Sequence, residues 1–68
     1  MNRVASERKL QGLTQIELAS KLQVNPSTVV RWEAGGAIPQ QNIGKLRRLF
    51  RCDTDWLLGL SNDRRTVE

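Results

Sequence analysis

The stretch from Leu13 to Gly35, LTQIELASKLQVNPSTVVRWEAG, constrains the fold of this chain most. It contains two helix starts in close succession. Thr14 followed by Glu17 fits a capping box, in which each side chain accepts a hydrogen bond from the other residue's backbone N–H. Asn25 is a good N-cap residue, and Pro26 suits the first helical position, where a missing N–H costs nothing. The sequence therefore predicts two short helices joined by a tight turn. Their expected ranges are Thr14–Leu22 and Pro26–Ala34.

Helical spacing separates an inner from an outer side in both helices. The expected inner residues are Ile16, Leu18, Ala19, Leu22, Val29 and Trp32. Ser27, Thr28 and Arg31 then point elsewhere, and a helix–turn–helix with such a polar outer face has the shape that enters a DNA major groove. Ser27 and Thr28 offer hydroxyl groups to base edges. Arg31 either reads a guanine with two bonds or binds a phosphate, and the sequence leaves both roles open.

Three short words, GLTQIELASKL, STVVRWEAG and TDWLLGL, occur in this order in the chain. With this spacing the chain resembles the phage repressor and Cro-like (XRE-type) helix-turn-helix family of transcriptional regulators. The resemblance runs from about Arg8 to Leu60. It implies an all-α fold, a compact five-helix bundle like the lambda repressor DNA-binding domain. The expected domain is 1–60, with the helix-turn-helix at 14–34 and a flexible tail at 61–68.

The resemblance also implies roles for single residues. An arginine at the position of Arg8 pairs with a glutamate at the position of Glu33, which would tie the first helix to the third by a bidentate clasp. The alternative is that both side chains are solvated. Gln15 corresponds to a glutamine that contacts a DNA phosphate, although it could be an ordinary exposed polar residue. Asn25 either contacts a phosphate or only caps its helix. The residues expected at phosphates are Gln15, Asn25, Gln40, Gln41 and Lys45.

The remaining helices are expected at 2–11, Gln40–Phe50 and about Thr54–Leu58. Apolar contacts are expected from Val4, Leu10, Ile43, Leu46, Leu49, Phe50, Trp56 and Leu57. Asp53 is placed to cap the last helix, and Cys52 is interpreted as a small buried hydrophobe. Leu58 and Leu60 either complete the core or form a dimer contact, since this end of the domain often forms the dimer contact in the family.

Three positions depart from the family. Gln23 stands where glycine is usual, and a left-handed turn there should cost glutamine about 1 kcal/mol. Ala34 and Gly36 stand where an asparagine and a nearby lysine often face phosphates. The grip on the DNA backbone is therefore expected to be weaker at this loop, or to come from main-chain N–H groups.

Composition limits what the chain can be. Its 68 residues allow one domain, and the formal net charge is +4. Residues 1–51 carry nine Lys or Arg against three acidic residues, which suggests a polyanionic partner, although surface charge can also serve solubility alone. The absence of histidine and the single cysteine argue against a metal site and a histidine-based catalytic site. With no paired catalytic carboxylates on one face and no phosphate-cradling glycine loop either, neither an enzyme nor a cofactor is expected. No apolar run is long enough for a membrane span, and the start MNRVASERKL is too polar for a signal peptide, so a cytoplasmic protein is expected.

These features predict a sequence-specific double-stranded DNA-binding transcriptional regulator, a repressor that binds a palindromic operator as a homodimer. One alternative is an antitoxin of the same fold, with a toxin protein as its partner. Another is a protein-interaction module that no longer binds DNA, which the missing loop cations would suit.

Overall fold

The computed structural model describes residues 2–64, which form five α-helices and no strand. The predicted all-α, five-helix fold is therefore confirmed. The helices are α1 (Val4–Leu10), α2 (Gln15–Leu22), α3 (Pro26–Glu33), α4 (Gln40–Phe50) and α5 (Thr54–Leu57). The predicted bounds of α4 are the observed ones, whereas α1 is shorter than the expected 2–11.

Side-chain caps start both helices of the helix-turn-helix, as predicted. Thr14 Oγ1 accepts the Glu17 N–H at 3.0 Å, and Glu17 Oε1 accepts the Thr14 N–H at 2.9 Å. The bond from the Thr14 backbone lowers the pKa of Glu17, because it favours the ionised carboxylate. Asn25 Oδ1 accepts the Ser27 N–H at 3.0 Å. Between the two helices, Gln23 adopts the left-handed conformation, with φ 58° and ψ 43°.

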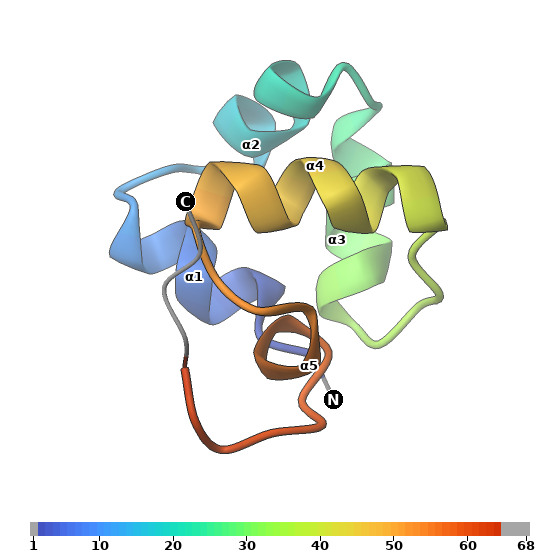
Figure 1. Ribbon diagram of the computed structural model, residues 1–68. Helices are drawn as coiled ribbons and strands as arrows, with labels where there is room; N and C mark the ends of the chain where they lie inside the picture. The colour runs from blue at the N-terminus through green and yellow to red at the C-terminus, as the bar shows by residue number, and fades with distance from the viewer. Residues whose placement is uncertain (1, 65–68) are drawn as a thin grey trace.

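A single buried cluster fills the space between the helices. Its members are Val4, Leu18, Ala19, Leu22, Val29, Trp32, Leu46, Phe50, Cys52 and Leu57. Helix α2 packs against α3 and α4, α1 packs against α3, and α5 packs against α4. Figure 1 shows α4 crossing the view in yellow and orange, with the other helices around it. Helix α3 is thus held on its inner side by two helices.

A buried carboxylate joins α1 to the C-terminal part of the domain. Glu7, whose side chain is 3% exposed, accepts two hydrogen bonds from Arg64, each 2.9 Å long. It also accepts the indole N–H of Trp56 at 3.0 Å, and Arg64 Nη2 donates to the Phe50 carbonyl at 2.9 Å. The Arg64 bonds hold the pKa of Glu7 below its ordinary value, against the opposing effect of burial. Arg64 therefore fastens the segment after α5 to α1.

Arg3 makes a second connection between the start of α1 and α5. Its backbone N–H donates to the Leu57 carbonyl at 2.8 Å, and its guanidinium donates to the Trp56 carbonyl at 2.6 Å. The guanidinium also lies over the Trp56 ring, 3.7 Å from the centroid, which is a cation–π geometry. Trp56, predicted as core, is half-buried and packs against the core with its polar edge bonded.

Several sequence-based expectations about burial were wrong. Leu10 and Ile16 are 71% and 69% exposed. Each lies on the outer side of its helix: Ile16 is about 160° around α2 from Leu18, and Leu10 about 120° around α1 from Val4. Ile43 is only half-buried, whereas Leu46 and Phe50 of the same expected stripe are fully buried.

One expectation near the C-terminus needs correction, and a second stays a prediction. Asp53 is the N-cap residue of α5, but its side chain makes no capping hydrogen bond. The segment predicted as a flexible tail, 61–68, includes Arg64, which the Glu7 bonds hold in place. The last four residues of that tail, 65–68, lie outside the described residues.

Cys52 occupies the core immediately before α5. It is fully buried, as predicted, and burial raises the pKa of its thiol because the thiolate would lose its solvation. The cysteine thus fills space in the core as a small apolar side chain.

Candidate nucleic-acid interface

The first turn of α3 presents polar groups to solvent. Asn25, Pro26 and Ser27 are exposed, and Asn25 Oδ1 accepts both the backbone N–H of Ser27, at 3.0 Å, and its hydroxyl, at 2.8 Å. Asn25 is therefore a cap in this structure. Its amide nitrogen takes no part in the cap and remains a donor that a phosphate could use.

Ser27, Thr28 and Arg31 lie together on the outer side of α3, and we refer to these three residues as the reading face. Ser27 and Arg31 are exposed and Thr28 is half-buried, whereas Val29 and Trp32 are fully buried on the opposite side. Because residues three and four apart are neighbours on a helix surface, Arg31 lies beside both hydroxyl residues. The structure thus brings the predicted base-reading residues together on one accessible surface.

The hydroxyl of Ser27 is already committed as a donor. Since it donates to Asn25 Oδ1 at 2.8 Å, its oxygen lone pairs are the groups that face outward. In this state Ser27 suits a base-edge donor, such as the amino group of adenine or cytosine. Among residues 2–64, Arg31 makes no ion pair, so its guanidinium is available to a base or a phosphate.

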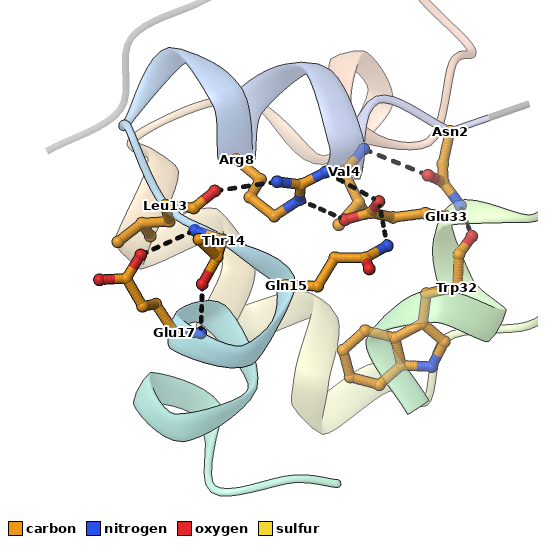
Figure 2. A network of polar contacts seen from close by, with 9 residues as sticks. All are labelled: Asn2, Val4, Arg8, Leu13, Thr14, Gln15, Glu17, Trp32 and Glu33. Atoms are coloured by element: carbon orange, nitrogen blue, oxygen red, sulfur yellow. Dashed lines mark hydrogen bonds and ion pairs between the residues drawn. The ribbon is translucent and has the colours of Figure 1, made fainter. Parts of the chain in front are cut away.

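A network of charged and polar groups fixes the last turn of α3 (Figure 2). Arg8 Nε donates to Glu33 Oε2 at 2.7 Å and Arg8 Nη2 to Glu33 Oε1 at 3.2 Å, and the two side chains are 12% and 9% exposed. Arg8 Nη1 also donates to the Leu13 carbonyl at 2.9 Å. The bidentate geometry joins α1, the turn before α2, and α3 in one contact.

Gln15 belongs to the same network. Its Nε2 donates to Glu33 Oε1 at 3.0 Å, and the residue is half-buried (Figure 2). A glutamine amide carries two N–H donors, so one remains for a phosphate after this bond. The phosphate role of Gln15 stays a prediction. The structure adds that its side chain is oriented by the carboxylate at the end of α3.

The amide of Asn2 reaches the other side of the same helix end. Its Nδ2 donates to the Trp32 carbonyl at 2.7 Å, and its Oδ1 accepts the Val4 N–H at 3.1 Å. One side chain therefore caps the start of α1 and satisfies a carbonyl at the end of α3 (Figure 2). Sequence reasoning missed Asn2. Its place just before a helix indicates a cap, but nothing local indicates a bond to a residue thirty positions away.

The first two turns of α4 contain the other predicted phosphate contacts. Gln40, Gln41 and Lys45 are exposed, whereas Asn42 is buried. No side chain caps this helix, because Pro39 precedes it, so the first-turn N–H groups of Gln40 and Gln41 are available to an anion. Gln40 and Gln41 thus offer donors at the start of α4, and Lys45, one turn after Gln41, adds a positive charge.

The two leucines considered for a dimer contact differ in exposure. Leu58 is half-buried and Leu60 is 74% exposed, so Leu60 is the larger apolar surface after α5. Other exposed apolar side chains, Leu10, Ile16 and Val30, lie on α1, α2 and α3.

The part of the chain from residue 2 to residue 64 contains no group of three or more histidine, cysteine, aspartate or glutamate side chains that could hold a metal ion. Within the same range, every helix is too short or too polar to cross a membrane.

Comparison with known families agrees with this geometry. A family model described as helix-turn-helix matches residues 4–57, which span all five helices. Searches of curated proteins and of solved structures gave no significant match.

Proposed function

We propose a cytoplasmic repressor that binds a palindromic operator as a homodimer. The proposal starts from the family: the chain belongs to the Cro/C1-type helix-turn-helix family of DNA-binding regulators. The first turn of α3 would enter the major groove, and the reading face would contact base edges. Occupancy of a promoter site is the whole mechanism, and it requires no chemical step.

One observation carries the proposal: the outer side of α3 is free while its inner side is fixed. Val29 and Trp32 are fully buried, and Glu33 is held by Arg8 and Gln15. Base reading needs side chains whose backbone is held in register with the DNA, because a small displacement removes the hydrogen bonds that discriminate bases. The fixed helix supplies that register, and Ser27 and Arg31 supply the exposed groups.

Phosphate contacts would set the position of the domain on the duplex. Helix starts favour this role, because their unpaired N–H groups and helix dipole attract anions. We assign phosphates to Gln15 at the start of α2, Asn25 before α3, and a group in the first two turns of α4. That group is Gln40, Gln41 and Lys45.

Size supports the homodimer. The domain extends 29 Å along its longest axis, which is less than one turn of B-DNA. One domain can therefore cover one half-site, and a second copy is needed to reach a half-site about 34 Å away. Leu60, with Leu58 beside α5, supplies exposed apolar surface for the contact between copies.

Selection of bound sites from a pool of random duplexes tests this proposal. The expected result is a palindrome with half-sites about one helical turn apart, and affinity that falls steeply between two salt concentrations. An affinity that does not depend on salt would contradict the proposed DNA binding and favour a protein-interaction module. A single unrepeated half-site would contradict the homodimer. Placing the selected site across a promoter in a reporter strain then tests repression, which the proposal expects.

A further inference from the structure

Two consecutive glycines close the end of α3. The Gly35 N–H donates to the Trp32 carbonyl at 3.0 Å, and the Gly36 N–H donates to the Arg31 carbonyl at 2.9 Å. With Gly35 at φ 104°, these bonds form a Schellman motif. Arg31 of the reading face is the residue whose carbonyl accepts the outer bond, so the loop closes directly on it.

The two glycines are needed for different reasons. A Cβ at Gly35 would meet nothing within 4 Å, so this position requires glycine for its backbone angle alone. A Cβ at Gly36 would lie 2.8 Å from the Arg31 carbonyl oxygen and 2.9 Å from Arg31 Cγ. Position 36 therefore has no room for a Cβ, which would clash with both the backbone and the side chain of Arg31.

The contact between Gly36 and Arg31 affects the direction in which the Arg31 side chain points. In Schellman motifs the side chain of the residue after the left-handed position usually packs on the residue five before it. Here those two positions are Gly36 and Arg31, so the loop leaves the stem of Arg31 room to lie against the backbone of Gly36. Cγ is set by χ1, which has three staggered choices, and a Cβ at position 36 would exclude the observed one.

We propose that Gly36 is a specificity-determining residue: the bare backbone there permits the χ1 rotamer that Arg31 adopts, which a Cβ would exclude, and so the base edge that its guanidinium reaches. The proposal rests on the proposed function. It makes Gly36 a positioning residue, which acts on DNA through Arg31.

The test compares Gly36→Ala, Arg31→Ala and the double variant, with Gly44→Ala as the control. A Cβ at Gly44 meets nothing within 4 Å, so this control changes glycine to alanine without a clash. Binding to the selected site and to its single-base variants gives the base preference at each position. Gly36→Ala is expected to reduce preference about fivefold or more at the position that Arg31→Ala affects, the lower end of what a bidentate arginine contact discriminates. In the Arg31→Ala background it should change no preference further.

A separate measurement covers the case in which Gly36→Ala does not fold. Nuclear magnetic resonance of the unaltered protein should show one χ1 rotamer for Arg31, with Overhauser contacts between Gly36 Hα and Arg31 Hγ. Averaged couplings without those contacts would overturn the proposal. So would a folded Gly36→Ala variant that keeps the base preference, or one that weakens all sequences equally. If the unaltered protein shows no sequence preference, the proposed function fails, and this inference fails with it.

Discussion

Arg8 and Glu33 are joined by two hydrogen bonds, of 2.7 Å and 3.2 Å, although 25 positions separate them in the chain. The pair connects α1 to the last turn of α3. Because the two side chains are only 12% and 9% exposed, each would be a poorly solvated charge without the other.

We expect that removing one partner of this pair destabilises the domain more than removing both. Glu33→Leu alone should cost about 3 kcal/mol, because it leaves the Arg8 guanidinium buried and unpaired. Arg8→Met together with Glu33→Leu should recover part of that loss. Urea unfolding of the unaltered protein, the two single variants Arg8→Met and Glu33→Leu, and the double variant measures the four free energies of unfolding. If the losses of the two single variants add up to the loss of the double variant, the pair does not interact.

Arg31→Ala should relax base preference at one position of the operator half-site. The expected loss of discrimination there is roughly 1–3 kcal/mol, because a bidentate contact with guanine would disappear. Titrations of the selected site and its single-base variants measure it. An equal loss of affinity for every sequence would instead assign Arg31 to a phosphate.

Lys45→Gln should weaken binding to all sequences by a similar factor. Each phosphate contact releases about one counterion, so the slope of log affinity against log salt should become less steep by about one for each protomer, or about two for the homodimer. Lys21→Gln is the matched control, since Lys21 is also exposed but lies in the last turn of α2, away from the helix starts assigned to phosphates. Equal effects of the two variants would indicate a general effect of net charge.

Gln23→Gly should stabilise the domain by roughly 0.5–1 kcal/mol. Gln23 holds φ at 58°, a left-handed conformation that glycine adopts without steric cost. Gln11 is a suitable control, because it follows α1 with φ at −80°, where glycine brings only a larger entropy loss on folding. Gln11→Gly should therefore destabilise, and the opposite signs can be read from two urea melts.

The Glu7 contacts predict how stability depends on pH. Because the folded-state pKa of Glu7 is lowered from 4.5, its contribution is complete above that value and is lost as the pH falls through the lower folded pKa. Glu7→Gln should cost about 1–3 kcal/mol at pH 7, since Arg64 loses its charged acceptor. Below pH 4.5 the difference in the free energy of unfolding between the unaltered protein and Glu7→Gln should shrink. A gap that stays constant down to pH 3 would count against an ionised Glu7.

Much of the helix-turn-helix could be predicted because its signals are local. The capping box of Thr14 and Glu17 and the Asn25 cap each depend on neighbours within a few residues. The left-handed turn at Gln23 was expected from the glycine that the family usually has at that position. Family resemblance supplied the long-range partners Arg8 and Glu33, which no local rule connects.

The wrong burial predictions arose where a residue was expected inside because it is apolar, without regard to its angular position around the helix. Ile16 and Leu10 are apolar, but their directions oppose the inner faces of α2 and α1. The inner face of α1 is occupied instead by Val4, the buried carboxylate of Glu7 and the clasped Arg8. A charged residue is expected outside unless its partner is known, and the partner of Glu7 lies 57 positions away.

The contacts of Asn2 and Arg64 were missed because their partners are distant in the sequence. Both residues occur in short polar segments that resemble ordinary chain ends, and their bonds depend on where Trp32 and Glu7 lie after folding. Arg51 ends α4 in a left-handed conformation, with φ 53°. Helices often end in this way at a glycine, so an arginine at this position did not indicate the turn.

The burial of Cys52 has a practical consequence for covalent labelling. The sequence contains one cysteine, and burial both shields its sulfur and raises the pKa of its thiol. Such a thiol reacts slowly with maleimides at neutral pH, because the thiolate is the reactive form. A cysteine substituted for exposed Lys21 would therefore carry a fluorophore or spin label at a single position while Cys52 stays in the core.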